Sequence, residues 1–349
     1  FLYPFSILYD GITQVRNFLY NHKYKKVQKF HNPVINIGNL TVGGTGKTPH
    51  VEYLIHLLKN NFAISTLSRG YKRTTKGFLW ASQQENALTL GDEPMQFYTK
   101  FGKQIRVAVG EKRAPAIETI FNTKYSQNTD NQLVILDDAF QHRPVKAGIN
   151  ILISDYNRPF YEDFVLPSGR LRESRKGAKR ADAVIVSKCP IELTKKTQLE
   201  IKNKIAPYIK KGTPIFFSYI SYQNLKPCFE DSAFSKEIPQ KVVLFTGIAK
   251  TKPLVNYVKT KFNLLKHFEF ADHHQYKISD IEKLKLDFER IREEGCCLLS
   301  TEKDSVKLQK SEFKKVLQGI PIFYLPICIE FFESELNFDD WVETKLEMK

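Results

Sequence analysis

A chain of 349 residues with 42% hydrophobic and 13% aromatic residues has the length of about two domains and the composition of a globular protein, which excludes an intrinsically disordered chain. Its 53 Lys and Arg residues outnumber 38 Asp and Glu residues, and the formal net charge of +15 favours a polyanionic partner such as nucleic acid, an anionic membrane surface or a phosphorylated substrate. No apolar run reaches the roughly 18 residues of a membrane-spanning helix, and five cysteines without a CxxC pair indicate a reducing compartment, the cytoplasm, without structural zinc.

The first element that we expect in chain order is an amphipathic helix, within a segment of residues 1–30. Its apolar residues recur at alternating steps of four and three, which places them on one helical face, and a lysine cluster follows. The face consists of Phe1, Phe5, Leu8, Ile12, Val15 and Leu19, and the cluster consists of Lys23, Lys25, Lys26 and Lys29. Such a pattern is typical of a helix packed on its own domain and also of a helix lying in a membrane interface, and the pattern alone leaves both open.

A glycine-rich stretch follows the apolar run at 33–37 and ends in Lys47 and Thr48, next to a helical pattern at 51–58. This order of strand, glycine loop and helix is typical of proteins that bind the phosphates of a nucleoside triphosphate. The glycines let backbone N–H groups approach phosphate oxygens, Lys47 adds a positive charge near the β- and γ-phosphates, and the Thr48 hydroxyl suits Mg²⁺. The stretch departs from the usual signature in having Thr41 where a first glycine is expected. The residues predicted to bind nucleotide here are Thr41, Val42, Gly43, Gly44, Thr45, Gly46, Lys47 and Thr48.

Short apolar runs then alternate with helical patterns, which predicts a mostly parallel sheet with helices on both faces, the architecture of a P-loop NTPase. These predicted strands are 63–67, 105–109, 133–136, 149–153, 183–186 and 215–219. A polar stretch at 221–240 is the predicted connection to a second, smaller α/β domain. We therefore expect one domain at 31–225 and another at 226–349. The predicted elements of the second domain are 242–245, 254–262, 278–291, 296–300 and 322–325.

Carboxylates occur at two positions where one predicted element gives way to the next. Asp137 and Asp138 end the predicted strand at 133–136, at the edge where parallel sheets hold ligands, and such an aspartate can bind Mg²⁺ in a P-loop protein. The alternative for this pair is a capping aspartate at a turn. Asp92 is placed either to cap the helical pattern at 95–101 or to orient an attacking oxygen.

Two further groups of polar residues are candidates for binding or catalysis. Arg172 and Glu173 lie in an arginine-containing turn, and Arg113 follows a Gly-Glu-Lys sequence. Arginine forks bind phosphate oxygens, but the spacing fits a solvated basic loop equally well. The sequence Asp272-His273-His274 could relay a proton, ligate zinc or simply occupy a loop, and no cysteine or third ligand completes a metal site beside it.

Eight motifs in a fixed order resemble a known family. They are Gly38-Asn-Leu-Thr-Val-Gly-Gly-Thr-Gly-Lys-Thr-Pro49, Leu67-Ser-Arg-Gly-Tyr71, Gly91-Asp-Glu-Pro94, Leu136-Asp-Asp-Ala-Phe-Gln-His142, Leu166-Pro-Ser-Gly-Arg-Leu-Arg-Glu173, Phe245-Thr-Gly-Ile248, Asp272-His-His274 and Ser300-Thr-Glu-Lys-Asp304. Together they resemble the tetraacyldisaccharide 4'-kinases of the lipid A pathway of Gram-negative bacteria. The resemblance implies transfer of the γ-phosphate of ATP, with Mg²⁺, to the 4'-hydroxyl of an acylated glucosamine disaccharide 1-phosphate, giving lipid IVA. It also implies work at the cytoplasmic face of the inner membrane, which would make the helix within 1–30 a membrane-binding element.

The same resemblance implies roles for individual residues. Asp92 matches the catalytic aspartate of the family and His273 matches its partner, so the smaller domain is expected to close over the nucleotide. The other implied roles are phosphate and Mg²⁺ binding for Lys47 and Thr48, the metal shell for Asp137 or Asp138 with Glu173, and neutralisation of phosphate charge for Arg113 and Arg172.

Two other functions remain as alternatives. A GTPase switch would need an Asn-Lys-x-Asp sequence to read guanine, and the nearest stretch, Ser187-Lys-Cys-Pro190, lacks its aspartate. A nucleic-acid-dependent ATPase would fit the positive charge, but no RRM, OB-fold or helix-turn-helix pattern is present. We therefore expect a lipid acceptor, no nucleic-acid partner and no obligate protein partner.

Overall fold

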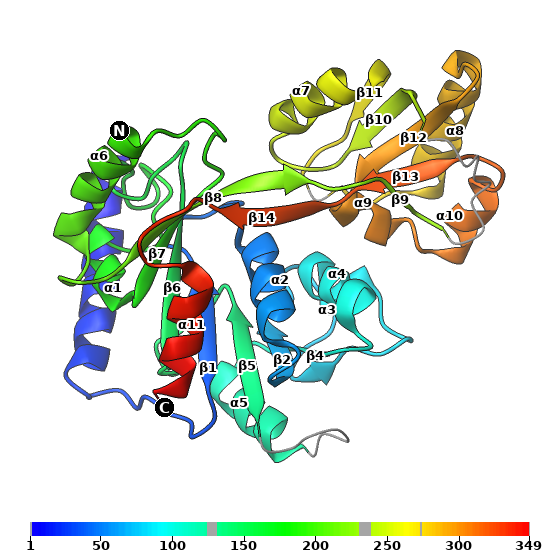
Figure 1. Ribbon diagram of the computed structural model, residues 1–349. Coiled ribbons are helices and arrows are strands. Elements are labelled where there is room, and N and C mark those ends of the chain that lie inside the picture. The colour runs from blue at the N-terminus through cyan, green and yellow to red at the C-terminus, as the bar shows by residue number, and fades with distance from the viewer. Residues whose placement is uncertain (1, 124–130, 230–238, 273, 349) are drawn as a thin grey trace. The chain divides into compact units, whose positions relative to one another are not determined.

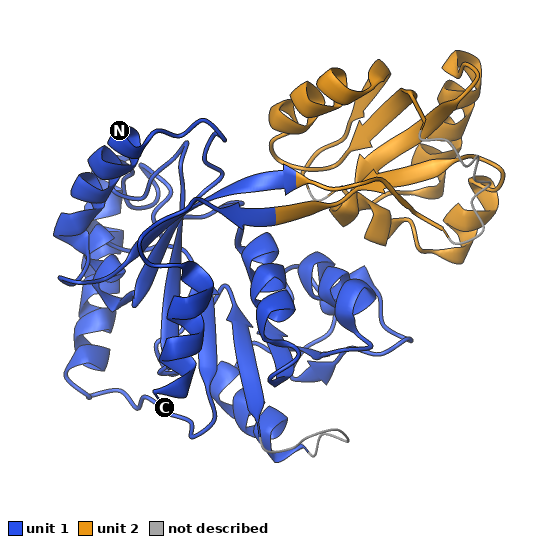
Figure 2. Ribbon diagram, in the orientation of Figure 1, with its two compact units in different colours: residues 1–221, 329–349 blue, residues 222–328 orange. Residues whose placement is uncertain are grey.

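The computed structural model describes residues 2–123, 131–229, 239–272 and 274–348, and it divides the chain into two compact units (Figure 2). Unit 1 contains residues 1–221 and 329–349, and unit 2 contains residues 222–328. The predicted boundary at 225–226 lies close to this division, but the prediction that the second domain extends to residue 349 is wrong. The chain returns to unit 1 because Trp341 and Val342 bury their side chains in the core of that unit.

Unit 1 is built on a nine-stranded sheet with the order β14-β8-β7-β6-β1-β5-β2-β4-β3. The neighbouring pairs from β8 to β4 are parallel, and β3 runs antiparallel to β4. The strands are β1 (Val34–Gly38), β2 (Ala63–Ser68), β3 (Leu79–Trp80), β4 (Arg106–Val109), β5 (Gln132–Asp137), β6 (Ile149–Asp155), β7 (Ala183–Ser187), β8 (Ile215–Tyr222) and β14 (Ile327–Phe331). The central strands are buried on both faces and are mostly apolar, as the sequence predicts for a parallel sheet, although they include buried polar residues such as Asn36 of β1 and Gln132 of β5.

Helices cover both faces of this sheet because successive side chains of each strand point to opposite sides. On β5, Leu133 and Ile135 pack with α2, α4 and α11, whereas Val134 and Leu136 pack with α5. Figure 1 shows α2 and α11 in front of the sheet. The helices of unit 1 are α1 (Tyr3–Asn21), α2 (Lys47–Leu58), α3 (Ala87–Leu90), α4 (Asp92–Phe101), α5 (Arg113–Asn122), α6 (Lys195–Ile205) and α11 (Phe338–Glu347), with 3₁₀ turns at Arg175–Arg180 and Ala206–Tyr208. The predicted fold class is confirmed.

Unit 2 is a smaller α/β unit around a five-stranded sheet with the order β11-β10-β12-β13-β9. Its strands are parallel except for β9, which runs antiparallel to β13. The elements are β9 (Lys226–Pro227), β10 (Lys241–Thr246), α7 (Lys252–Lys261), β11 (Asn263–Glu269), α8 (Ile278–Ile291), β12 (Cys296–Thr301), α9 (Glu302–Lys307), α10 (Ser311–Val316) and β13 (Ile322–Leu325). The sequence did not indicate β11, because its side chains are only partly buried and lack a continuous apolar run.

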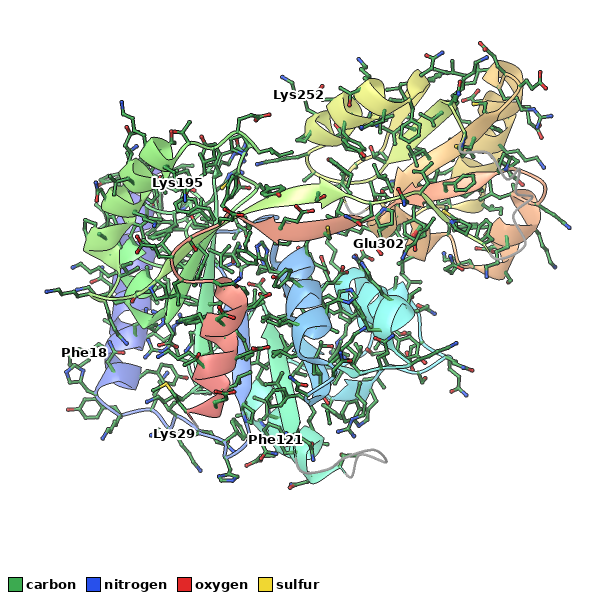
Figure 3. The ribbon with its side chains drawn as sticks, in the orientation of Figure 1. Phe18, Lys29, Phe121, Lys195, Lys252 and Glu302 are labelled. Carbon is green, nitrogen blue, oxygen red and sulfur yellow. The ribbon has the colours of Figure 1, made fainter. Side chains whose placement is uncertain are left out.

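Helix α1 turns its polar side toward the rest of unit 1 and its apolar side outward. The Ser6 hydroxyl donates a hydrogen bond to the Val165 carbonyl at 2.9 Å, and the Asn17 amide donates one to Glu173 at 2.7 Å. Four of the six side chains of the predicted face are exposed, with Phe5 at 58%, Leu8 at 65%, Ile12 at 63% and Val15 at 61%. Leu19 is partly buried, and Phe1 lies outside the described residues. Figure 3 shows the labelled Phe18 at the outer edge of α1.

Within the described residues, no helix is both long enough and apolar enough to cross a bilayer.

Candidate active site

The glycine-rich loop connects β1 to α2 at the centre of the large sheet. Gly43 and Gly46 adopt φ values of 102° and 90°, in the left-handed region that favours glycine. Gly46 is the N-cap of α2, so Lys47 and Thr48 begin the helix. The first N–H groups of a helix lack intrahelical partners and carry the positive end of its dipole, so this position attracts a phosphate.

The segment before the helix is fixed by the chain around Arg172. The Val42 N–H donates to the Arg170 carbonyl at 2.8 Å, and the Arg172 N–H donates to the Leu40 carbonyl at 2.7 Å. Thr41, which stands where the usual signature has glycine, is buried and pairs with Leu171 in an antiparallel bridge. Thr41 thus supports the loop from its flank.

Two aspartates lie at the carboxyl end of β5, next to the loop. Asp137 is the last residue of β5 and lies in register with Ile37 of β1. Asp138 follows with φ of 56°, and Lys47 Nζ lies 3.6 Å from its Oδ1. The two terminal nitrogens of the Arg172 guanidinium donate to the two carboxylate oxygens of Asp138, at 2.9 and 3.0 Å. The structure therefore brings together Lys47, Asp137, Asp138 and Arg172 as the sequence predicts.

The two aspartates differ in charge state because their surroundings differ. Burial raises the pKa of Asp137 to about 7, an effect that the charge of Lys47 opposes and that of Asp138 reinforces. Burial also acts on Asp138, but the charges of Lys47 and Arg172 hold its pKa below the usual value. Asp137 accepts one hydrogen bond, from Ser68 Oγ at 3.3 Å, and its Oδ1 is buried without a hydrogen-bond partner among the described residues. That atom is a ready ligand for a cation.

The raised pKa of Asp137 predicts an unusual dependence of stability on pH. Its folded-state pKa of about 7 exceeds the ordinary value of 3.8, so the folded protein holds the proton more tightly. The associated stability is present at low pH and is lost as the pH rises through about 7. We expect Asp137→Asn to raise the free energy of unfolding of the Mg²⁺-free protein by about 2–4 kcal/mol at pH 8, with the gain shrinking toward pH 4. Chemical denaturation in a chelator checks this against Asp340→Asn, an exposed control, and a variant less stable than wild type at pH 8 would contradict it.

Arg113 lies near the same carboxylates. It is the first residue of α5 and is buried, and its Nη1 donates to the Glu111 carbonyl at 3.0 Å. Burial and the charge of Arg69 lower the pKa of Arg113 to about 10, while the charges of Asp137 and Asp138 oppose that change. A buried cation of this kind suits the binding of phosphate oxygens.

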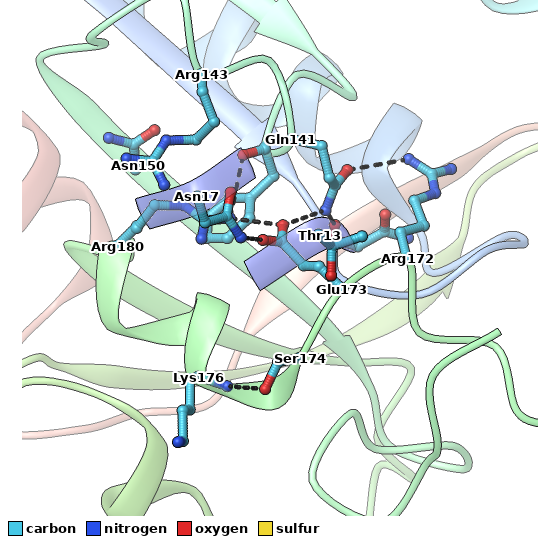
Figure 4. A network of polar contacts seen from close by, with 12 residues as sticks. Thr13, Asn17, Gln141, Arg143, Asn150, Arg172, Glu173, Ser174, Lys176 and Arg180 are labelled. Atoms are coloured by element: carbon cyan, nitrogen blue, oxygen red, sulfur yellow. Dashed lines mark hydrogen bonds and ion pairs between the residues drawn. The ribbon is translucent and has the colours of Figure 1, made fainter. Parts of the chain in front are cut away.

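Glu173 has partners other than those that the sequence suggested (Figure 4). It is completely buried, and Oε1 accepts from Arg180 at 2.6 Å and from Gln141 at 3.2 Å. Asn17 of α1 donates to Oε2 at 2.7 Å. Both oxygens are thus engaged by protein groups, and Glu173 links α1 to the segments that carry Gln141 and Arg180. Within the described ranges, no group of three or more His, Cys, Asp or Glu side chains could hold a metal ion.

Asp92 is the first residue of α4 and is buried. The N-cap of that helix is Gly91, so the interpretation of Asp92 as the capping residue is wrong. Gly91 has φ of 99°, and a Cβ at this position would approach the Gly70 backbone to 3.2 Å. The close approach of these two glycines brings the start of α4 against the turn that follows β2.

The predicted partner of Asp92, His273, lies outside the described residues. Its neighbour His274 stacks on Phe270, and its Nε2 lies 2.9 Å from Asp280 Oδ2 at the start of α8. His274 therefore has a local role at the N-terminus of that helix.

Four polar residues around the site have no individual role predicted from the sequence: Ser68, Arg69, Glu93 and His142. Ser68 bonds Asp137, and the charge of Glu93 contributes to the raised pKa of Asp137. Burial lowers the pKa of His142 to about 4, and the charges of Arg113 and Arg69 lower it further. Ser68, Arg69, Glu93 and His142 all lie inside the motifs that resemble the kinase family. What the sequence lacked was the fold that joins the ends of β2 and β5 with the start of α4.

A glycine loop at a helix N-terminus, a lysine that opens the helix and two aspartates at the end of the adjacent strand define a P-loop enzyme that binds a nucleoside triphosphate. Comparison with known proteins narrows this class. Residues 1–347 match the family described as tetraacyldisaccharide-1-P 4'-kinase, and the chain belongs to that family.

Individual relatives agree with this assignment. The tetraacyldisaccharide 4'-kinase of Flavobacterium johnsoniae is 43% identical over 97% of this chain and 94% of its own length. That of Bacteroides thetaiotaomicron is 39% identical over 96% of this chain and 89% of its own. The crystal structure of LpxK from Aquifex aeolicus in complex with ATP superposes with a TM-score of 0.74 and 29% identity, covering 99% of this chain and 98% of that one. The prediction of an ATP-dependent kinase of lipid A biosynthesis is confirmed over a GTPase switch or a nucleic-acid-dependent ATPase.

Proposed function

We propose that this chain transfers the γ-phosphate of ATP to the 4'-hydroxyl of a tetraacylated glucosamine disaccharide 1-phosphate, using the residues around its phosphate loop, at a membrane surface. The observation that carries the proposal is the meeting of Lys47 with Asp138 and Arg172, at the carboxyl edge of the sheet and at the N-terminus of α2. Phosphoryl transfer depends mainly on positioning and on neutralising phosphate charge. The site supplies positioning and positive charge through three cations, Lys47, Arg113 and Arg172, which lie beside the carboxylates of Asp137 and Asp138.

The donor half of the site would hold the triphosphate of ATP. The backbone of residues 41–48 would cradle the phosphates, and Lys47 Nζ would bind the β- and γ-phosphate oxygens. Arg172 and Arg113 would neutralise charge that shifts during transfer. Arg172 is held by both carboxylate oxygens of Asp138, so its guanidinium is aligned before ATP arrives.

Two features support Mg²⁺ as the cofactor. Asp137 Oδ1 is buried without a hydrogen-bond partner among the residues described, and Thr48 offers a hydroxyl from the first turn of α2. Mg²⁺ favours oxygen ligands and is commonly held by one or two carboxylates together with phosphates of the substrate. The ion would supply charge neutralisation on the phosphates. Asp137 would have to give up its proton to bind it, so Mg²⁺ binding should weaken below pH 7.

Asp92 is the residue that we propose to orient the acceptor hydroxyl. It is a buried carboxylate at the start of α4, close to the turn that follows β2. Ser68, the last residue of β2, donates a hydrogen bond to Asp137. A carboxylate such as Asp92 can align a sugar hydroxyl and accept its proton during transfer. Pairing of Asp92 with His273 stays a prediction, as does closure of the smaller unit over the nucleotide.

Helix α1 is the proposed membrane contact. Its outward face carries Phe5, Leu8, Ile12 and Val15, each more than half exposed, while its polar side is held by unit 1. Exposed lysines at 23–29 follow it. A contiguous apolar face beside basic residues fits an anionic membrane surface, and burial of each such side chain contributes about 1.5–3 kcal/mol. Docking there would bring the site to an acceptor whose acyl chains remain in the bilayer.

Removing this apolar face should weaken membrane binding without harming the chemistry. We expect a triple variant with Phe5→Ser, Leu8→Ser and Ile12→Ser to lose at least about 100-fold in affinity for anionic vesicles. Its kcat with detergent-dispersed acceptor should stay within about threefold of wild type. Vesicle co-sedimentation measures the first quantity, with Leu8→Ser paired against Leu286→Ser as single exposed-leucine variants. Equal sedimentation of the triple variant and wild type would contradict the membrane role of α1.

The proposed reaction is tested by the dependence of ATP turnover on the acceptor. Release of ADP should require both Mg²⁺ and the tetraacyl disaccharide 1-phosphate, and DNA or RNA should not stimulate it. Turnover driven by nucleic acid, or unaffected by the lipid, would contradict the proposal.

A further inference from the structure

Three consecutive carbonyls of the phosphate loop each accept a hydrogen bond from a side chain behind the loop. Lys188 Nζ donates to the carbonyl of Gly44, and Ser187 Oγ lies 2.7 Å from that of Thr45. His50 Nδ1 lies 2.6 Å from the carbonyl of Gly46. Ser187 ends β7, Lys188 follows it, and His50 belongs to α2. Two separate elements therefore hold the loop through its carbonyl groups.

The carbonyl bonds control where the loop N–H groups point. A peptide unit is planar, and in the trans form its C=O and N–H point in opposite directions. Holding the carbonyls of Thr45 and Gly46 toward the protein therefore turns the N–H groups of Gly46 and Lys47 the other way. Those two groups precede and open α2, where an anion binds. The side chains of Ser187 and His50 thus fix donors that they do not touch.

The two hydrogen-bond partners of His50 fix the tautomer of its neutral ring. The Gly46 carbonyl can only accept, so Nδ1 carries the proton, and Nε2 accepts from the Ser218 hydroxyl at 2.9 Å. His50 is 2% exposed and Ser218 is fully buried. Burial lowers the pKa of His50 to about 4, an effect that the Gly46 bond opposes and that the charge of Lys188 reinforces. The imidazole is therefore neutral around pH 7.

Packing alone does not require a histidine at this position. The ring lies beside apolar and aromatic neighbours such as Phe331, 6.1 Å away between centroids, where a phenylalanine of similar shape would also fill space. A buried imidazole is costly unless both nitrogens have partners. Here both have them, and one partner belongs to the phosphate loop.

We propose that His50 and Ser187 are positioning residues that preorganise the phosphate loop for ATP. The inference rests on the proposed role of that loop. The fixed N–H groups contact phosphates in the bound and reacting states alike, so their loss should raise KM for ATP and leave kcat nearly unchanged. A role in packing alone would instead lower the melting temperature and the fraction of active enzyme at constant KM.

The test uses variants that separate the two nitrogens of His50. His50→Asn can still present an amide donor near the Nδ1 position, whereas His50→Phe keeps only the ring shape. We expect KM for ATP to rise about tenfold in His50→Phe and in Ser187→Ala, and by less than about threefold in His50→Asn. His56→Phe, on the exposed side of the same helix, is the control and should match wild type.

The outcomes are distinguishable from failure of the proposed function. Unchanged KM for ATP in both His50→Phe and Ser187→Ala, with an active wild type, would overturn the inference. Wild-type protein without affinity for ATP would overturn the function of the loop instead. Should His50→Phe fail to fold, Ser187→Ala decides the result, because it removes one hydroxyl group. Calorimetric titration with a non-hydrolysable ATP analogue gives the affinity independently of turnover.

Discussion

Replacement of Asp92 by Asn is expected to lower kcat by about 10²–10⁴-fold while KM for ATP changes by less than about threefold. The substitution keeps the size of the side chain and removes the negative charge that would orient and deprotonate the acceptor hydroxyl. Because the phosphate loop and Lys47 are untouched, binding of ATP should persist. Steady-state kinetics with varied ATP and saturating lipid acceptor measures both quantities.

The Asp92→Asn substitution also removes a carboxylate from the first turn of α4, and this effect on helix stability must be distinguished from the effect on catalysis. Asp92 lies in the first turn of α4, where a negative charge interacts favourably with the helix dipole by about 0.3–1 kcal/mol. Asp340→Asn makes the same change in the first turn of α11, at an exposed position, and should retain full activity. A folded Asp92→Asn enzyme with kcat within about threefold of wild type would show that Asp92 does not orient the acceptor.

Replacement of Lys47 by Ala is expected to reduce kcat/KM by about 10³-fold or more, through both a higher KM for ATP and a lower kcat. In the proposed site the lysine would supply the cation closest to the β- and γ-phosphates, and its loss also leaves Asp138, 3.6 Å away, with less compensating charge. Lys59→Ala removes the same charge from the other end of α2 and should leave kinetics unchanged. Retention of more than about a tenth of wild-type kcat/KM by Lys47→Ala would contradict the assignment.

Much of the fold was predictable because each central strand contains a run of apolar residues. Residues 322–325 and 278–291 were placed at the observed bounds of β13 and α8, and β5 differed by one residue at each end. Strands with mixed burial, such as β11, gave no such signal. The return of residues 329–349 to unit 1 could not be predicted, because it depends on long-range packing that local patterns do not record.

The site was predictable where a residue type has one chemical use in its context. Lys47 in a glycine loop and Asp137 at a strand end are such cases, and the structure brings both to one edge of the sheet. Glu173 was placed by motif alone, and its oxygens instead bind Asn17, Gln141 and Arg180. A buried carboxylate in an arginine-rich segment can bind a metal ion or can accept hydrogen bonds from protein groups. Only the fold determines which partners reach it.

The orientation of α1 shows a similar limit. Spacing placed its apolar residues on one face but could not say whether that face points into the protein or away from it. The answer comes from the polar side, where Ser6 and Asn17 bond to unit 1. Those contacts leave the apolar side exposed and available for a lipid surface.

The position of the transferred phosphate tests the central claim most directly. The wild-type chain is incubated with γ-labelled ATP, Mg²⁺ and tetraacyl disaccharide 1-phosphate in detergent, and the lipid product is mapped by mass spectrometry and phosphorus NMR. We predict one new phosphate monoester, on the 4'-oxygen, formed by wild type and almost absent with Asp92→Asn and Lys47→Ala. A labelled phosphate at another oxygen, or no labelled lipid at all, would contradict the account.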